Sequence, residues 1–357
     1  MRVPSPPAPF VCVMYHYVRP IARGRYGGIK GLEAEDFRSQ IQHLKRHHTV
    51  VPMDAVVEAV GGGEPLPRDA CALTFDDGYA DHYRYAHPIM ASEGVTGAFY
   101  APRSVLEERR VLEVNKVHFI LALSEDANAL ERRVDAEIER ERRARPGELA
   151  RLSGVDALKA ELRHPGRFDP AGVIYIKRVL QHALPDAVRA RIADRLFAAI
   201  VSEDEAAFAE ELYLSLDQAR VMRDGGAHFG GHGDRHLWHS TLNEAGQRAE
   251  IDGADRLLDR IGVPRAGRTY CYPYGDHDAL TRRLLAGHGY ALAFTSATGR
   301  SDPAREDRFG LSRLDTNDLP LAADAPPGPW SRPATGPSGG KNAGENTGKD
   351  AGVAAHG

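Results

Sequence analysis

Four apolar segments are each followed at once by residues able to bind ions or transfer protons, and this pattern constrains the fold most strongly. The segments precede His16, Asp76-Asp77-Gly78, His232 with His236, and the cluster Pro273-Tyr274-Gly275, in which Tyr274 is the polar residue. A continuous apolar run suits a strand that is buried on both faces, as in a parallel sheet covered by helices. Because the carboxyl ends of parallel strands meet at one edge, we expect these polar residues to gather there.

Strand-like and helix-like segments alternate along much of the chain. In residues 34–47, apolar side chains recur at spacings of three and four, as on one face of a helix, and residues 244–261 also have helical character. The alternation predicts an α/β fold with a parallel sheet, either open or closed into a barrel. The segments that read as strands are 10–18, 70–75, 95–100, 227–230, 268–272, 290–295 and 311–314.

Between residues 105 and 214 the composition shifts toward Arg, Glu, Ala and Leu with helical periodicity. We interpret this stretch as a mostly helical insertion or cap that interrupts one domain made of residues 1–104 and 215–320. Its charged run at residues 139–148 suits a solvated face. Residues 321–357 are dominated by Pro, Gly, Asn and Ala, and we expect disorder because they cannot bury enough surface to offset chain entropy.

Composition and charge argue against several classes of partner. The 46 Lys and Arg against 50 Asp and Glu give a formal charge of −4, so no basic excess favours nucleic acid. No apolar stretch approaches about 18 residues, and the first residues lack the apolar core of a signal peptide. We therefore expect no membrane span and a cytoplasmic location. The three widely spaced cysteines suit buried thiols better than a disulfide framework.

Two pairs of residues are candidates for holding a metal ion. Asp76 and Asp77 follow a buried strand, where two carboxylates are costly unless a cation or donors compensate them, although alone they also suit a helix cap. His232 and His236 are spaced so that both can bind one ion, although such a pair also arises by chance among 16 histidines. Together, two imidazoles and one carboxylate suit zinc or another transition ion.

Three short motifs resemble the signatures of the polysaccharide deacetylase family, which includes chitooligosaccharide and peptidoglycan deacetylases. The segment Leu73-Thr-Phe-Asp-Asp-Gly78 resembles the first signature, the pair His232 and His236 the second, and Tyr272-Pro-Tyr-Gly275 the third. They occur in the same order as in the family. The resemblance covers roughly residues 10–104 and 215–318 and implies a (β/α) barrel-like fold with parallel strands, plus the helical insertion.

The resemblance also implies a role for each residue of the site. Asp77, His232 and His236 would bind a divalent metal ion, for which zinc is expected and cobalt, nickel, manganese and iron are alternatives. Asp76 would be the general base for a water that attacks an amide carbonyl, and the backbone N–H of Tyr274 would stabilise the oxyanion. The implied activity is the removal of an acetyl group from an N-acetylated sugar or glycan precursor.

The sequence departs from the family at two catalytic positions. Cys271 stands where the family has an Arg that pairs with the base, and Arg313 is a candidate substitute. The late signature that carries the usual general acid is not visible, because the only His after His288 is His356. We therefore assign the general acid to His16, which follows the first strand; the alternative is a structural histidine at a strand end.

Two other functions and several weaker site candidates remain open. The chain is alternatively a hydrolase of non-sugar amides, or an inactive carbohydrate-binding protein. The sequence specifies neither the sugar, nor N- against O-acetyl, nor the oligomeric state. The weaker candidates, each of which also has a plain structural explanation, are Tyr79 and Trp238 as walls for a sugar ring, Asn115, Lys116 and His118 at a helix start, and Asp315 and Asp318 near the last strand.

Overall fold

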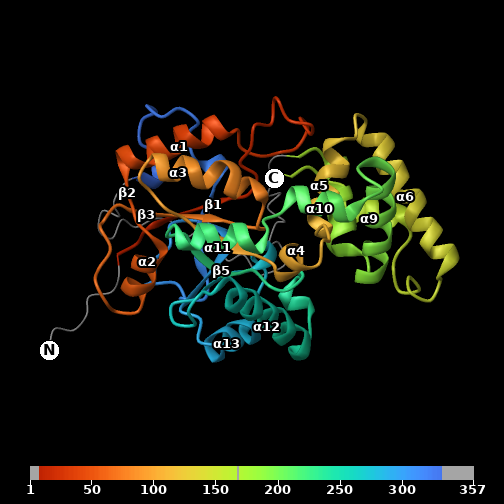
Figure 1. The fold of residues 1–357 in the computed structure, drawn as a ribbon. Coiled ribbons are helices and arrows are strands. Elements are labelled where there is room, and N and C mark those ends of the chain that lie inside the picture. Colours follow the sequence, from red (N-terminus) through yellow and green to blue (C-terminus); the bar gives the residue numbers. More distant parts are fainter. Residues whose placement is uncertain (1–7, 167–168, 332–357) are drawn as a thin grey trace, which may run out of the picture. The chain divides into compact units, whose positions relative to one another are not determined.

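The computed structural model describes residues 8–166 and 169–331, which form two compact units (Figure 1). Among these residues, unit 1 comprises 8–20, 32–109 and 210–331, and unit 2 comprises 21–31 and 110–209. The domain limits drawn from the sequence remain a prediction, and nothing in the sequence indicated that residues 21–31 group with the helical unit. Residues 332–357 of the predicted disordered tail lie outside the described residues.

Seven parallel strands of unit 1 close into a barrel, which confirms the predicted barrel-like α/β fold (Figure 1). The ring runs β1-β3-β4-β5-β6-β7-β8 and returns to β1, while the two-residue β2 pairs only with the start of β3. The sequence did not predict β2, which is too short to carry a pattern. The strands are β1 (Val11–Tyr15), β2 (Thr49–Val50), β3 (Ala70–Phe75), β4 (Ala98–Ala101), β5 (His228–Gly231), β6 (Thr269–Cys271), β7 (Leu292–Thr298) and β8 (Leu311–Asp315).

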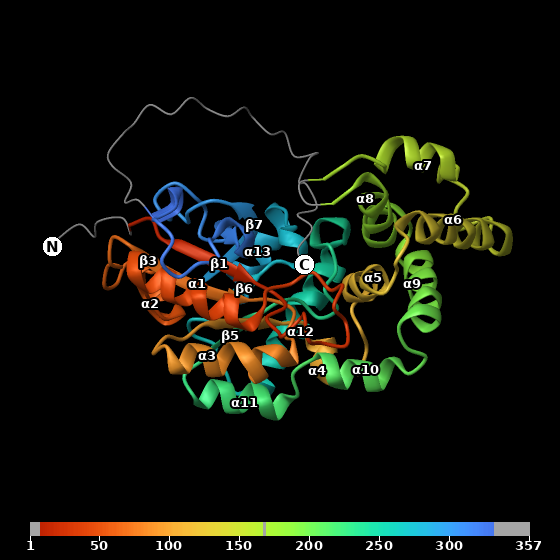
Figure 2. The same cartoon turned by 90° about the horizontal axis from the view of Figure 1, so that it is seen from above.

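Helices surround the strands of unit 1 (Figures 1 and 2). In α1 (Ala34–His47), Phe37, Ile41 and Leu44 form part of the buried face. Acidic residues in its first turn and basic residues in its last turn complement the helix dipole. The other α-helices of the unit are α2 (Met53–Val60), α3 (His87–Ser92), α4 (Arg103–Glu107), α11 (Leu216–Asp224), α12 (Glu244–Ile261) and α13 (Ala279–Gly287). Its short helical turns are η1 (His82–Ala86), η3 (His239–Thr241), η4 (Pro273–Gly275), η5 (Thr316–Asp318) and η6 (Pro329–Ser331).

Alternate side chains of the strands enter two different apolar clusters. Along β1, Cys12 belongs to the cluster that fills the barrel, whereas Val11 and Val13 join the cluster beneath the helices. In the second cluster Phe75 stacks between the rings of Tyr15 and Phe99, with centroids 5.1 and 4.8 Å away. This alternation turns the residue that follows Phe75 toward the inside of the barrel.

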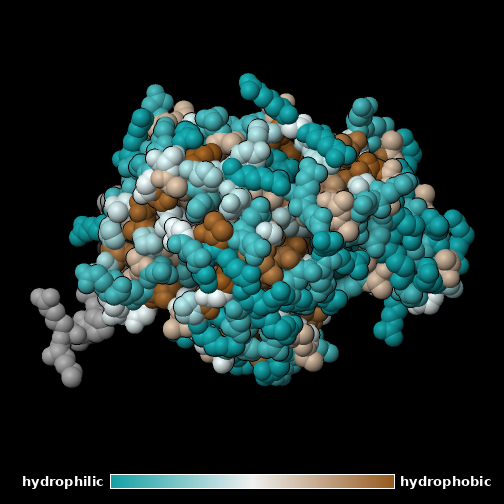
Figure 3. Space-filling view, viewed as in Figure 1, coloured by the Kyte–Doolittle hydropathy of each residue, from teal (hydrophilic) through white to brown (hydrophobic). Residues whose placement is uncertain are grey.

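Unit 2 is helical in its described part. The ring of Tyr26 packs against Phe119 and Phe208, which explains why residues 21–31 belong to this unit. The surface around α6 is largely hydrophilic in Figure 3, consistent with the predicted solvated face at residues 139–148. The helices are α5 (Glu113–Ala122), α6 (Ala127–Ala144), α7 (Val155–Leu162), α8 (Ala171–Arg178), η2 (Val179–Ala183), α9 (Asp186–Ile200) and α10 (Glu205–Leu212), which ends in unit 1.

No helix in the described part of the chain has the length and apolar character that a membrane crossing needs. The cytoplasmic location expected from the sequence stays a prediction.

Replacing Phe75 by Ala tests the stacked aromatic core of unit 1. Because the ring is fully buried, we expect the variant to lose about 3–5 kcal/mol of unfolding free energy. Both tryptophans, Trp238 and Trp330, lie in unit 1, so their fluorescence during chemical denaturation reports on this unit. Leu321→Ala, at an exposed position, is the control and should change the value by less than about 0.5 kcal/mol. Equal effects of the two substitutions would contradict the assignment.

Candidate metal centre

Asp77, His232 and His236 come together beyond the carboxyl ends of β3 and β5, two barrel strands that β4 separates in the ring. Asp77 Oδ1 lies 3.3 Å from Nε2 of His232 and 3.3 Å from Nε2 of His236. All three side chains are buried, and one potential ligand atom of each lies within 4.8 Å of the others. The structure thus brings the three predicted ligands to one point, with a donor set that suits a transition ion.

Local backbone geometry aims these side chains. Asp77, His236 and Tyr274 have φ angles of 71°, 62° and 59°, in the left-handed region that residues with a side chain rarely adopt. Gly78 and Gly275 continue two of these turns with positive φ. Such conformations cost roughly 1–3 kcal/mol each and persist where the surroundings fix them, typically at functional sites.

Hydrogen bonds to the outer atoms of His232 and Asp77 turn the Nε2 and Oδ1 atoms of these residues toward each other. His232 Nδ1 donates to the carbonyl of Cys271 at 2.7 Å, so its Nε2 points toward Asp77. The hydroxyl of Tyr79 donates to Asp77 Oδ2 at 2.6 Å. Asp77 Oδ1, by contrast, is buried without a hydrogen-bond partner among the described residues. A buried carboxylate oxygen without a donor is costly, and a cation would compensate it.

Asp76 is held beside this site by an arginine from the last strand. Arg313 Nη1 and Nη2 donate to the two carboxylate oxygens of Asp76 at 3.0 and 2.8 Å, and both side chains are buried. Burial raises the pKa of Asp76, but Arg313, then His232 and His16, outweigh it and lower the pKa to about 2. Asp76 is therefore ionised at neutral pH.

Arg313 lies beside Cys271, the position at which the resemblance implies an arginine. Its Nη1 lies 3.2 Å from the sulfur of Cys271, and its Nε donates to the carbonyl of Thr295 at 2.9 Å. The guanidinium therefore reaches Asp76 from β8 through the barrel interior, while the strand position at Cys271 carries only a small thiol. The candidate pairing of Arg313 with Asp76 is present in the structure.

The loop that carries both histidines is fixed from outside the site. The carboxylate of Glu250, on α12, accepts the backbone N–H groups of Asp234 and Arg235 at 3.0 Å each. From the start of α4, the backbone N–H of Ser104 donates to the carbonyl of Asp234 at 2.9 Å, and the Arg103 side chain pairs with its carboxylate. These contacts set the turn between His232 and His236, and sequence patterns alone did not single out Glu250.

His16 and Tyr274 both lie near the metal-ligand cluster. His16 follows Tyr15, which is in register with Phe75, and it contributes to the electrostatics of Asp76 and Asp77. The ring of Tyr274 lies 4.6 Å from that of His236 and stacks on Trp238 with centroids 4.2 Å apart and planes inclined by 7°. His16 and Tyr274 thus share the strand-end edge that the sequence predicted.

The structure gives several of the weaker site candidates a structural role. Tyr79 is not a wall for a sugar, since it is fully buried and hydrogen-bonds Asp77. Asp315 and Asp318 cap the short η5 turn. Lys116 is buried in unit 2, where it pairs with Asp194 and Glu205. Asn115 and His118 belong to the same helix of that unit, α5.

Removing the Arg313 guanidinium tests the buried ion pair. Arg313→Met leaves the Asp76 carboxylate buried without its partner, and we expect a loss of about 3–5 kcal/mol in unfolding free energy, followed by tryptophan fluorescence. Adding Asp76→Asn should recover part of this loss, with a coupling of about 0.5–3 kcal/mol. Arg305→Met, at an exposed position, is the matched control. Strictly additive effects of the two buried substitutions would refute the pairing.

Comparisons with known proteins agree with the motifs. Residues 199–293, which include both histidines and Tyr274, match the sequence profile of the family described as Polysaccharide deacetylase. Over 88 residues the chain is 33% identical to poly-beta-1,6-N-acetyl-D-glucosamine N-deacetylase of Escherichia coli strain K12. This alignment spans 24% of the chain and only 13% of that enzyme.

A solved structure shows the same fold. The deacetylase PplD of Streptococcus pyogenes, determined in complex with acetate, superposes with a TM-score of 0.53 at 15% identity, over 87% of this chain and 92% of that one. IcaB from Ammonifex degensii gives a TM-score of 0.49 at 17% identity, over 91% and 97% of the two chains. The profile match and the likeness in fold to PplD show that the chain is similar to the polysaccharide deacetylase family.

Proposed function

We propose that the chain is a metal-dependent hydrolase that removes the acetyl group from an N-acetylated sugar or glycan precursor. The observation that carries the proposal is the buried cluster of Asp77, His232 and His236 with an ionised Asp76 beside it. The deacetylase activity in the name of the Escherichia coli relative supports the reaction class, although the aligned segment is a small part of that enzyme.

The three buried side chains fit a divalent ion. Two imidazoles and one carboxylate form the kind of donor set that binds zinc and also admits cobalt, nickel, manganese or iron. Asp77 Oδ1 faces both imidazole nitrogens but accepts no hydrogen bond from the described residues, so it is the atom that most needs a cation. A bound ion would supply Lewis acidity toward water and toward the acetyl carbonyl.

The remaining residues suit the proton transfers of amide hydrolysis. Asp76, oriented by both nitrogens of Arg313, accepts the proton of the attacking water. His16, at the end of β1, donates a proton to the leaving amine, and the backbone N–H of Tyr274 stabilises the oxyanion. The stacked rings of Trp238 and Tyr274 offer a flat surface beside His236 for a sugar ring.

Loss of one imidazole should abolish tight metal binding. We expect His232→Ala to weaken zinc binding by more than about 100-fold, because a ligand is removed rather than a group that merely supports one. The measurement is calorimetric titration of metal-stripped protein with zinc, together with metal analysis after purification. His164→Ala, in unit 2, is the control and should bind zinc like the parent protein. Full zinc affinity in His232→Ala would exclude this site.

Substitution of the two proton-transfer residues should lower turnover without removing the metal. We expect Asp76→Asn and His16→Gln each to reduce kcat for acetate release by roughly 10²–10⁴-fold, since general acid–base catalysis contributes about that much. Acetate is measured with a panel of acetylated amino sugars, in parallel with small non-sugar amides.

The same measurements separate the open alternatives. Unchanged turnover in Asp76→Asn would remove this residue from the base role, and unchanged turnover in His16→Gln would leave the histidine structural. Release of acid only from the non-sugar amides would assign the chain to the other hydrolase class. Metal binding without any turnover would favour a carbohydrate-binding protein.

A further inference from the structure

Tyr79 gives the two carboxylate oxygens of Asp77 different surroundings. Its hydroxyl donates to Asp77 Oδ2 at 2.6 Å, and both side chains are buried. Asp77 Oδ1, which faces Nε2 of His232 and of His236, accepts no hydrogen bond from the described residues. The protein therefore occupies one oxygen itself and leaves the other for an ion.

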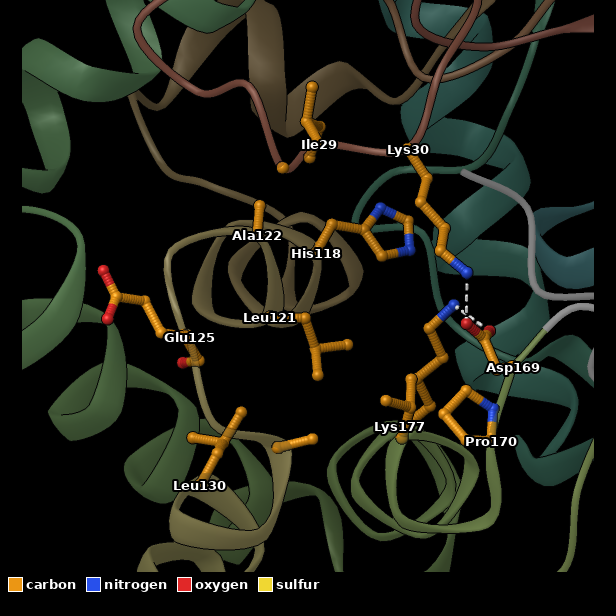
Figure 4. Close-up of a pocket in the computed structure, with 14 residues that line it drawn as sticks. Ile29, Lys30, His118, Leu121, Ala122, Glu125, Leu130, Asp169, Pro170 and Lys177 are labelled. Atoms are coloured by element: carbon orange, nitrogen blue, oxygen red, sulfur yellow. Dashed lines mark hydrogen bonds and ion pairs between the residues drawn. The ribbon is translucent and has the colours of Figure 1, made fainter.

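Two other buried aspartates have donors at both carboxylate oxygens. Arg313 donates to the two oxygens of Asp76 at 3.0 and 2.8 Å. At a cavity of about 230 Å³ in unit 2, Lys177 Nζ donates to Asp169 Oδ2 at 2.9 Å, and Lys30 Nζ pairs with Asp169 Oδ1 (Figure 4). Asp77 differs from both, since only one of its oxygens has a hydrogen-bond donor.

The ring that carries this hydroxyl is enclosed by other aromatic rings. Tyr79 stacks on Tyr17 with centroids 4.1 Å apart and on Tyr213 with centroids 6.1 Å apart, and all three side chains are buried. Tyr79 and Tyr213 are also joined by a backbone bridge. Because a closely packed ring cannot swing aside, its hydroxyl stays on Asp77 Oδ2 whether or not an ion is bound.

The spacing of the ligand atoms suits an ion with few ligands. Asp77 Oδ1 lies 3.3 Å from each of the two imidazole nitrogens. With bonds of about 2.0–2.1 Å, tetrahedral ligand atoms stand about 3.3–3.4 Å apart, whereas adjacent octahedral ones stand about 2.8–3.0 Å apart. Zinc favours four ligands, of which a catalytic site draws three from the protein. Manganese, by contrast, favours an octahedral set rich in oxygen.

We propose that Tyr79 is a positioning residue that restricts Asp77 to one metal-binding oxygen and thereby favours zinc or cobalt over ions that take more ligands. A carboxylate whose second oxygen is released can bind one ion through both oxygens, which raises the number of ligands around that ion. The inference rests on the metal site of the proposed function. It adds to that function a residue that determines which ion the site holds.

Tyr79→Phe tests the proposal, because it removes the hydroxyl and keeps the ring. The full chain, stripped of metal, is titrated calorimetrically with zinc and with manganese. We expect zinc to bind about 10–100-fold more weakly than to the parent protein, since a ligand loses its supporting hydrogen bond, and manganese affinity to change by less than about threefold. Tyr175→Phe is the matched control, because its hydroxyl donates to Asp135 at 2.7 Å in unit 2, and it should bind both ions like the parent.

Cobalt provides a spectroscopic readout that a loss of stability does not imitate. Four-coordinate cobalt absorbs visible light much more strongly than five- or six-coordinate cobalt. The cobalt-loaded parent protein should therefore show the strong absorption, and Tyr79→Phe saturated with cobalt should show a weaker one. The measurement on the parent needs no variant, so it tests the coordination even where Tyr79→Phe does not fold.

Three results would overturn the proposal. These are weak cobalt absorption in the parent protein, equal losses of zinc and manganese affinity in Tyr79→Phe, and a Tyr79→Phe protein that binds zinc and absorbs like the parent. Circular dichroism of the metal-free variant checks its fold. His232→Ala separates the two proposals: full zinc affinity there would exclude the metal site itself, whereas its loss there beside a parent-like Tyr79→Phe would exclude only the role of Tyr79.

Discussion

The contact on which the candidate metal centre depends is the buried pair between Arg313 and Asp76. A guanidinium inside a barrel is costly unless its donors are satisfied, and this one reaches a carboxylate, a backbone carbonyl at Thr295 and the hydroxyl of Thr74. These partners lie on or next to strands β3 and β7, while Arg313 itself lies on β8. One side chain thus connects separate parts of the barrel wall and fixes the carboxylate beside Asp77.

The strained turns depend on this packing. Asp77 can keep a positive φ because Tyr79 holds one of its oxygens and Asp76, its neighbour, is held by Arg313. His236 keeps its own strained turn because Glu250 fixes the loop between the two histidines. Contacts that lie outside the metal-ligand cluster therefore orient its side chains.

The sequence predicted the elements better than the contacts. Helices α1 and α12 have the predicted limits because their apolar periodicity is regular and long. Strand β4 begins at Ala98 rather than at Val95, since a run of apolar residues does not show where pairing starts. The three ligands were predicted from spacing and order. Glu250, by contrast, lies outside the motifs, and no pattern in the sequence indicates its role.

Arg313 shows why contacts within the site could not be predicted from the sequence. From the sequence, Arg313 was only a candidate partner of Asp76, because the two residues are 237 positions apart. Arg313 lies on β8 and Asp76 follows β3, and β1 separates these strands in the ring. The barrel makes them neighbours, since side chains from any strand that alternate inward share one interior. An arginine on β6, as the resemblance implies at position 271, and an arginine on β8 could therefore reach the same carboxylate, provided that the other strand carries a small residue. In this chain β6 carries the small residue Cys271, and its sulfur contacts the guanidinium of Arg313.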